Sequence, residues 1–217
     1  MTVRDLVVYG AGGHAHSVVE AIEAEGRWQL VGLLDDNAPD GAEVLGFRVL
    51  GGQQRLRQLT NDGVSAGIAA VGDNRTRLEV LARFRELGIE PVTVIHPTAL
   101  VMARATIGAG SFVHGYAIVG PTCNIGEGAI ISAHTTVGHQ SRLGDGVHLS
   151  PGVRIGGACE LGDRSTFGPG AVLYPGRWVG ADAEVWANAV ATRDVAPGDA
   201  VGGIPARSMR SGPTRSN

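Results

Sequence analysis

Residues 125–168 read IGEGAIISAHTTVGHQSRLGDGVHLSPGVRIGGACELGDRSTFG, and an apolar residue returns in this stretch every six positions. The series extends in both directions, from Val101 to Val185, and all fifteen of its members are apolar. Glycine directly follows nine of them. Because about half of the residues in a typical protein are apolar, a chance run of this length would occur roughly once in thirty thousand trials. The period is typical of the hexapeptide repeat of a parallel β-helix.

Each repeat of six residues is expected to form one short strand and one turn, with the apolar residue pointing inward. Three repeats close a triangular coil, so residues 18 positions apart stack in adjacent coils about 4.8 Å apart. The glycines after the apolar residues are expected to supply the positive φ that turns often require. The series predicts about five coils over residues 94–191. It does not set the hand of the coil, because parallel connections are normally right-handed.

The first 93 residues carry a different pattern, in which strand-like runs alternate with helix-like runs. A strand is expected over residues 3–9, before the loop Gly10-Ala11-Gly12-Gly13. Two more strands, expected over residues 29–34 and 66–71, end at Asp35-Asp36 and at Gly72-Asp73-Asn74. This alternation predicts a small parallel sheet in a Rossmann-like α/β domain over residues 1–93. Ligands of such sheets bind at the carboxyl ends of the strands.

The glycine-rich loop precedes a helix, so its backbone N–H groups at Gly12 and Gly13 are suited to hold a phosphate. The alternative is that these glycines only form a tight turn. A nicotinamide-dependent dehydrogenase uses a similar loop, but 93 residues offer about half of the usual dinucleotide fold. A mononucleotide therefore fits this domain better than a dinucleotide. Asp73 or Asn74 is expected to cap the helix that follows.

Composition excludes several classes of function. The net charge of −3 over 217 residues gives no electrostatic case for binding nucleic acid or an anionic membrane. The sequence has no signal-peptide pattern at its start and no apolar run of about 18 residues, so we expect a cytoplasmic protein without a membrane span. Cys123 and Cys159 are 36 residues apart. Two coils separate them by about 9.6 Å, too far for a disulfide, so both are expected to be buried thiols.

Six motifs together resemble the sialic-acid O-acetyltransferase-like family, which includes bacterial N-acetyltransferases of UDP- or GDP-linked 4-amino sugars. They are GAGGHA at 10–15, LLDDN at 33–37, AVGDNRTR at 70–77, VIHPTA at 94–99, TTVGHQSRLGDGVHLSPGVRIGG at 135–157 and GGIPAR at 202–207. The resemblance covers residues 3–208. It implies a left-handed β-helix over residues 94–191, after the domain of residues 1–93, and acetyl-CoA as cosubstrate. Residues 192–217 are then a segment that contacts CoA and ends in a mobile tail.

The resemblance also implies residue roles. His139 matches the general base that takes a proton from the acceptor, and His148 matches a second histidine near acetyl-CoA. Gly157 matches the backbone N–H that polarises the thioester carbonyl. The nucleotide-sugar contacts match His14, Asp35, Asp36 and Asn74, and the segment along CoA matches Ile204, Pro205, Ala206 and Arg207.

The spacing of three of these residues bears on how the site is assembled. His139 and Gly157 are 18 residues apart, so they stack in neighbouring coils, and a backbone donor one coil from the base suits acyl transfer. His139 and His148 are nine residues apart, which is half a coil, so they project from different sides of the triangle. A groove between two subunits would bring both to one substrate. We therefore expect a homotrimer with three shared sites.

Histidine suits the base because its reference pKa of about 6.5 lets it accept a proton near neutral pH. The family usually has a carboxylate directly after the base, and this chain has Gln140 there. The family also often has Asn at the position of Ser132 and a small residue at the position of His134. Both departures point to a different acceptor pocket. The sequence does not determine whether the acceptor is an amine or a hydroxyl, nor which sugar, nucleotide, acyl group and pathway are involved.

Other interpretations remain open. His134 and His139 have the spacing of two zinc ligands in hexapeptide-repeat carbonic anhydrases, but the third ligand position is Thr98, so we expect no metal. A free sugar such as a sialic acid is an alternative acceptor. A non-catalytic nucleotide-sugar-binding scaffold is a further alternative, because Gln140 cannot stabilise an imidazolium as a carboxylate does. His96 and His114 are expected to form a stacked pair, and Trp178 and Trp186 are expected to pack or to flank a groove.

Overall fold

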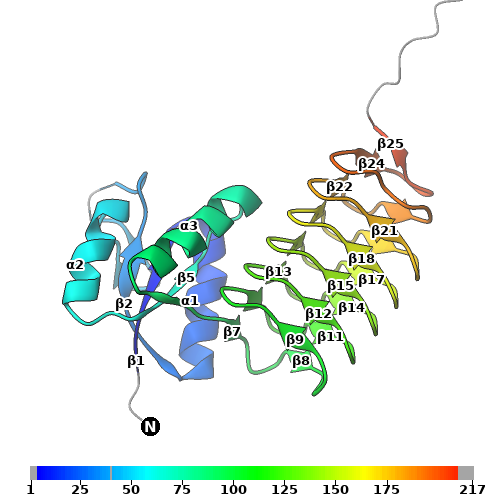
Figure 1. Cartoon of the computed structure of the whole chain (residues 1–217). Coiled ribbons are helices and arrows are strands. Elements are labelled where there is room, and N and C mark those ends of the chain that lie inside the picture. The colour runs from blue at the N-terminus through cyan, green and yellow to red at the C-terminus, as the bar shows by residue number, and fades with distance from the viewer. Residues whose placement is uncertain (1–3, 40, 210–217) are drawn as a thin grey trace, which may run out of the picture.

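The computed structural model describes residues 4–39 and 41–209 and shows an α/β unit followed by a left-handed parallel β-helix (Figure 1). The fold expected from the repeat and the strand–helix alternation is confirmed. Within these residues, none of the helices has the length and apolar character needed to cross a bilayer. The expected mobile tail beyond residue 209 lies outside the described residues.

The α/β unit is built on a four-stranded parallel sheet in the order β2-β1-β5-β6. Its elements, in chain order, are β1 (Arg4–Tyr9), α1 (Gly13–Glu25), β2 (Trp28–Leu34), β3 (Glu43–Val44), β4 (Phe47–Arg48), a 3-10 turn (Gln53–Arg55), α2 (Leu56–Asn61), β5 (Ala66–Ala69), α3 (Asn74–Glu86) and β6 (Glu90–Pro91). Alternate residues of β1 serve two cores, since Leu6 packs in the cluster of α1 and Val7 in the cluster of α3. Asp73 caps α3 by accepting a hydrogen bond from the N–H of Thr76 at 2.8 Å.

The β-helix is a triangular prism with three parallel sheets as its faces. Face A contains β7 (Val94–Ile95), β10 (Phe112–Val113), β13 (Ile130–Ile131), β16 (His148–Leu149), β19 (Thr166–Phe167), β22 (Glu184–Val185), β24 (Ala200–Gly202) and the antiparallel β25 (Arg207–Ser208). Face B contains β8 (Leu100–Val101), β11 (Ile118–Val119), β14 (Thr136–Val137), β17 (Arg154–Ile155), β20 (Val172–Leu173) and β23 (Val190–Ala191). Face C contains β9 (Thr106–Ile107), β12 (Asn124–Ile125), β15 (Arg142–Leu143), β18 (Glu160–Leu161) and β21 (Trp178–Val179).

Turns between the faces form three corners, and the corners position the chemistry. The chain passes from face A through corner AB (residues 114–117 and 132–135) to face B, and then through corner BC (138–141 and 156–159) to face C. It returns to face A through corner CA (126–129 and 144–147). From β7 to β20, every strand of the β-helix pairs with the strand 18 residues further on, as Ile118 with Thr136 and His148 with Thr166. The second residue of each strand points inward, and these residues form one continuous apolar core.

The glycines after the inward residues have a different role from the one expected. None of the nine has a positive φ; that conformation occurs two residues later, at Gly128 and Gly146 and at non-glycine residues such as Thr122 and Gln140. A Cβ at Gly138 would lie 2.5 Å from the carbonyl carbon of Gly156 in the next coil. Glycine is therefore required because adjacent coils approach backbone to backbone, a contact that leaves no room for a methyl group.

The α/β unit packs on the first half of face A (Figure 1). The outward side chains of this part of the face, Val94, Phe112 and Ile130, are buried in the same cluster as Val18 of α1. Further along face A, His148 and Thr166 are half-buried and Glu184 is exposed. The α/β unit therefore ends over the middle of the face, and a cleft opens at its edge.

Candidate functional site

The loop after β1 turns sharply into α1. Gly10 has a φ of +110°, and a Cβ there would lie 2.6 Å from the carbonyl oxygen of Ala70. Gly12 and Gly13 are exposed, and added Cβ atoms would meet nothing within 4 Å. No side chain caps the start of α1 and its first turn has no acidic residue. The N–H groups at this helix end are therefore open to an anion.

Asp35 and Asp36 follow β2 and lie beside this loop. Asp35 accepts hydrogen bonds from the N–H groups of Ala11 and Asn37, both at 2.8 Å. Asp36 accepts from the N–H of Gln53 at 2.7 Å and from the hydroxyl of Tyr9. Burial and the bond to Asp36 raise the pKa of Tyr9, so this phenol stays protonated as a donor. Both carboxylates thus order the loops at the carboxyl edge of the sheet.

His14 points from the start of α1 toward face A. Its ring packs edge-on against Phe112 at 5.3 Å, and its Nε2 atom is buried without a hydrogen-bond partner. Burial, followed by the positive electrostatic effect of His148 and Arg77, lowers the pKa of His14 to about 4. His14 is therefore neutral at physiological pH, with one ring nitrogen left to bind a ligand or water.

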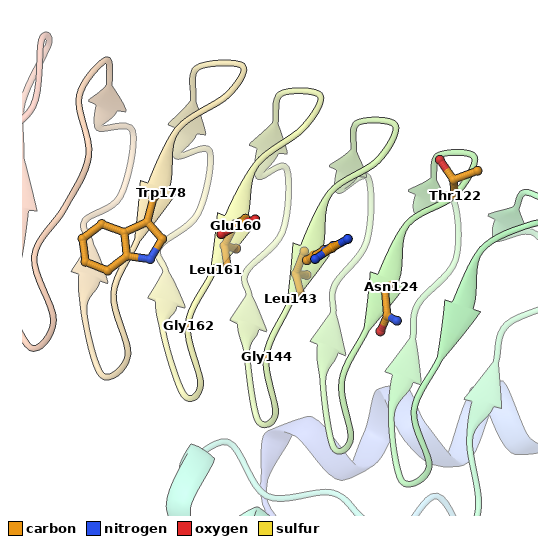
Figure 2. A pocket seen from close by; sticks show the side chains of 9 residues that line it. Thr122, Asn124, Leu143, Gly144, Glu160, Leu161, Gly162 and Trp178 are labelled. Atoms are coloured by element: carbon orange, nitrogen blue, oxygen red, sulfur yellow. The ribbon is translucent and has the colours of Figure 1, made fainter.

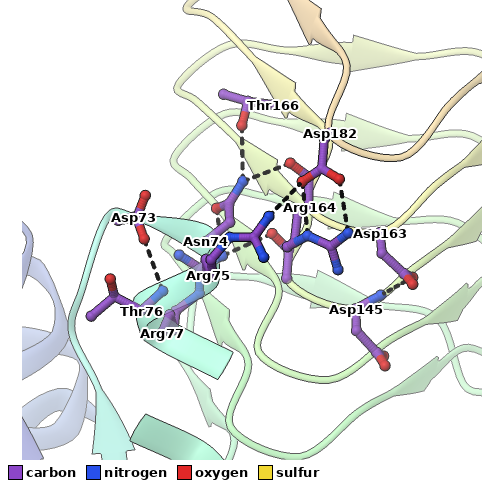
Figure 3. A network of polar contacts seen from close by, with 11 residues as sticks. Asp73, Asn74, Arg75, Thr76, Arg77, Asp145, Asp163, Arg164, Thr166 and Asp182 are labelled. Carbon is purple, nitrogen blue, oxygen red and sulfur yellow. Dashed lines mark hydrogen bonds and ion pairs between the residues drawn. The ribbon is translucent and has the colours of Figure 1, made fainter. Parts of the chain in front are cut away.

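A cleft of about 330 Å³ is lined by residues 72–75 and by the outward ladder His148, Thr166 and Glu184 on face A. Burial, then the nearby Arg77, lowers the pKa of His148 to about 4. On the cleft wall, Arg164 donates two hydrogen bonds of 2.8 Å to Asp182 (Figure 3). The structure thus brings His148 together with the Asn74 loop and the α/β unit.

Asn74 is held by contacts within the chain. Its Nδ2 donates to the carbonyl oxygen of Arg164 and to Oγ1 of Thr166, both at 2.9 Å, and its Oδ1 accepts from Arg77 at 2.8 Å (Figure 3). The amide is therefore engaged in joining α3 to face A, which favours an architectural role over the expected contact with a nucleotide sugar.

Sequence reasoning missed Arg77, a buried guanidinium that joins the two units. Three of its bonds stay within the α/β unit, to the carbonyl oxygens of Val71 and Gly72 and to Asn74, at 2.8 to 3.2 Å. The other two reach the carbonyl oxygens of Gly128 and Gly146 at corner CA, at 2.6 and 2.9 Å. All five donors are thereby used. The sequence did contain a signal that Arg77 would be buried. Position 77 lies on the same face of α3 as the apolar residues 80, 81 and 84.

His139 and Gln140 lie together at corner BC. The Nδ1 atom of His139 is 3.1 Å from Oε1 of Gln140. An amide oxygen only accepts, so Nδ1 carries the proton and Nε2 presents a lone pair. Gln140 therefore fixes the tautomer of His139. This is one function of the carboxylate that was expected at position 140 from the family resemblance.

Gly157 lies in the next coil, directly against the ring of His139. A Cβ at this position would be 2.6 Å from both Cε1 and Nε2. Among the described residues, the N–H of Gly157 donates to no protein acceptor. The equivalent N–H groups of Glu127 and Asp145 at corner CA are capped by an aspartate 18 residues further on, whereas Gly157 is followed at that interval by Pro175. A free donor thus lies beside the ring.

The remaining expected site residues lie elsewhere in the same chain. Corner BC is opposite face A, so His139 is on the far side of the prism from His148 and the α/β unit. Ser132 and His134 are at corner AB, one face away from His139. The segment Ile204 to Arg207 joins β24 to β25 at the end of the prism, and Ala206 donates to the carbonyl oxygen of Val190 at 2.8 Å.

Face C carries an open groove of about 580 Å³ beside corner BC. Figure 2 shows Trp178 and Glu160 on neighbouring strands, with Thr122 at the turn. Both Trp178 and Trp186 are exposed, and Trp178 flanks this groove, which is one of the two expectations for these residues. Cys123 and Cys159 are buried free thiols as expected.

Residues 5–84 match the family model of the PglD N-terminal domain, and residues 104–139 and 140–175 each match the bacterial transferase hexapeptide model of six repeats. A mutant of perosamine N-acetyltransferase from Caulobacter crescentus, solved with CoA and GDP-perosamine, is 33% identical. The match covers 97% of this chain and 99% of that one, with a TM-score of 0.92. The acetyltransferase domain of PglB from Neisseria gonorrhoeae FA1090, solved with acetyl coenzyme A, is 33% identical over 96% of this chain and 100% of that one, with a TM-score of 0.89.

A curated relative, UDP-N-acetylbacillosamine N-acetyltransferase from Bacillus subtilis (strain 168), is 29% identical over 113 residues. This match spans about half of each chain, 51% in both cases.

Proposed function

The chain belongs to the family of nucleotide amino-sugar N-acetyltransferases that join a PglD-type N-terminal domain to hexapeptide repeats, and from this membership we propose its reaction. It transfers the acetyl group of acetyl-CoA to the amino group of a nucleotide-linked sugar, with His139 as the general base. The observation that carries the proposal is the ring of His139 lying against Gly157, whose N–H donates to no acceptor within residues 4–39 and 41–209.

The nucleotide sugar binds at the carboxyl edge of the α/β sheet. The open N–H groups at Gly12 and Gly13 suit the diphosphate, because the start of a helix attracts negative charge. Asp35 and Asp36 follow the end of the neighbouring strand β2 and are suited to bind the nucleoside part of the ligand. The cleft beside His148 lies over face A, next to the loop that follows β5.

The chemical step is a direct transfer. Nε2 of His139 takes a proton from the acceptor amine as its nitrogen bonds to the thioester carbonyl carbon. The N–H of Gly157 stabilises the negative charge that develops on the carbonyl oxygen. The carbon–sulfur bond then breaks, and the sulfur of CoA leaves as a thiol with the proton returned by His139. The groups that move the proton and hold the oxyanion are thus one coil apart.

The site requires a second copy of the chain. The sugar-binding side lies over face A, whereas His139 lies at corner BC, opposite that face. Face B, which runs from corner AB to corner BC, exposes Leu100 and Ile118. Its further outward positions are Thr136, the exposed Arg154, and the half-buried Val172 and Val190. Burial of this mostly apolar face against a second copy would bring corner BC of one subunit to corner AB of the next. Closing the ring with three copies gives a homotrimer with three shared sites.

Acetyl-CoA would then lie in the groove between subunits, with its thioester at Gly157 and its length running toward the segment Ile204 to Arg207. That segment is well placed for this because it lies at the end of the same prism, and Ile204 is 76% exposed. The two unpaired thiols fit a reducing compartment, and we retain the cytoplasm as the expected location.

Release of CoA thiol tests the proposal, with acetyl-CoA and a panel of UDP- and GDP-linked amino sugars, nucleotide-linked hydroxyl sugars and free sialic acids. We expect turnover with a nucleotide-linked amino sugar and a loss of about 100-fold or more in His139→Asn. His16→Asn, an exposed change on α1, is the matched control. Turnover confined to hydroxyl acceptors would identify an O-acetyltransferase. Tight binding without thiol release would favour the scaffold, and full activity of His139→Asn would contradict the assigned base.

A further inference from the structure

Corner AB carries two aromatic rings in successive coils. The rings of Tyr116 and His134 are stacked, with centroids 5.3 Å apart and planes 5° from parallel. Both residues adopt the left-handed backbone conformation, with φ of 60° and 57°. Tyr116 is 63% exposed and His134 is exposed as well. The pair is therefore a rigid aromatic surface that buries little of itself in the chain.

In the next coil, the position that stacks on His134 at this corner carries no side chain. The next two residues in the same turn position are Gly152 and Gly170, both with positive φ. A Cβ at Gly152 would meet no atom closer than 3.9 Å. One face of the His134 ring is covered by Tyr116, and the other faces the hollow left by Gly152. A planar or chair-shaped ring of a ligand has room there.

The height of this hollow along the prism matches that of the reacting groups. His134 and His139 belong to the same coil, at the two ends of β14, and Gly152 and Gly157 belong to the next coil. Rotation about an axis that runs along the prism leaves the height of every residue unchanged. In the shared site, His139 of the partner subunit and Gly157 of the partner subunit therefore lie at the level of His134 and the hollow above it.

We propose that the stacked pair Tyr116–His134 is the platform on which the hexose of the acceptor lies, with its less polar face on the imidazole and its amine toward His139 of the partner subunit. The inference rests on the proposed function and adds a specificity-determining pair to it. The platform is preorganised, because the stack and the corner backbone hold the imidazole before the sugar binds. Ring contact of this kind selects for an acceptor with an apolar face and contributes to affinity more than to the chemical step.

The test compares substitutions at position 134. His134→Asn removes the ring but tolerates the left-handed backbone, and His134→Phe keeps a ring while removing both nitrogens. Tyr116 already holds an aromatic ring in that conformation one coil away, so Phe is compatible with the fold. We expect His134→Asn to raise the KM for the nucleotide amino sugar about tenfold, with the KM for acetyl-CoA and kcat changed less than twofold. His134→Phe is expected to stay within about threefold of the wild type.

Two further variants complete the design. Gly152→Asn fills the hollow and is expected to raise the same KM, whereas His96→Asn changes the other stacked pair of this corner, His96–His114, and is expected to have no effect. A fall in kcat at unchanged KM in His134→Asn, or equal defects in the Asn and Phe variants, would overturn the platform. Wild-type protein without transferase activity would instead overturn the proposed function. Thermal unfolding of each variant shows whether folding is intact.

Discussion

The imidazole of His139 lies directly against Gly157, so that a methyl group at position 157 would be 2.6 Å from Nε2, the ring nitrogen that we propose as the base. Gly157→Ala is therefore expected to displace the ring from the N–H of residue 157. We expect kcat to fall about 100-fold, since a misplacement of about 1 Å has this effect on a catalytic group. Steady-state kinetics with an unchanged melting temperature would support this reading. A variant of near-normal kcat would show that the contact is dispensable.

Gln140 orients His139 through Nδ1 but is neutral. Gln140→Glu places a carboxylate at the same position and is expected to raise kcat/KM by about threefold to tenfold, because the imidazolium formed during the reaction gains a counter-charge. Gln140→Leu removes the acceptor and is expected to lower kcat/KM about tenfold through loss of the correct tautomer. Thiol-release kinetics between pH 6 and 9 measure both effects. If the two variants behave alike, Gln140 does not act on the base.

Acid is expected to destabilise the protein through His14 and His148, whose pKa values are each lowered to about 4 mainly by burial. The unfolded chain binds these two protons below about pH 6.5, whereas the folded chain does not until about pH 4. The unfolded state therefore holds more protons in this window, and the free energy of unfolding decreases as the pH falls through it. The loss is of the order of 3 kcal/mol per histidine.

Urea denaturation at intervals from pH 7.5 to pH 4 measures this slope. His148→Gln is expected to flatten it whatever the variant's stability at neutral pH, and His16→Gln on exposed α1 surface is the control. Equal slopes in His148→Gln and the wild type would mean that His148 is not the titrating group.

Arg77 holds the α/β unit on the β-helix with two of its five hydrogen bonds, and burial lowers its pKa only to about 10, so it is charged at neutral pH. Arg77→Met leaves the carbonyl oxygens of Gly128 and Gly146 without this donor. We expect a loss of about 3 to 5 kcal/mol in the free energy of unfolding. Calorimetry is also expected to separate the melting of the two units. Arg75→Met, whose side chain is 69% exposed, should cost about 0.5 kcal/mol or less.

The proposal that sites are shared between subunits predicts complementation between inactive variants. Ile118→Asp places a charge on face B and is expected to yield monomers without activity, as measured by light scattering and thiol release. His139→Asn and Asp35→Ala carry their defects on opposite sides of the prism. When the two are unfolded and refolded together, mixed trimers are expected to regain part of the wild-type activity. An active monomer, or no recovery on mixing, would contradict a site shared between subunits.

The hexapeptide series was sufficient to predict the β-helix, because one apolar residue in six leaves a single way to form a continuous core. The same 18-residue period predicted that His139 and Gly157 stack and that His96 and His114 pair, and both were confirmed. It did not predict why the glycines recur. Glycine is required at these positions because adjacent coils lie so close together. That distance cannot be inferred from the conformation of a single turn.

The sequence by itself determined the face and coil of every residue from Val101 to Val185, since the period of 18 converts position directly into location. Only the tertiary structure decided where the α/β unit sits, because that depends on long-range packing of α1 on Phe112 and on the bonds from Arg77 to corner CA. That packing engages the amide of Asn74 and makes His148 a buried neutral group. It also leaves His139 on the opposite corner of the prism, away from His148 and the α/β unit.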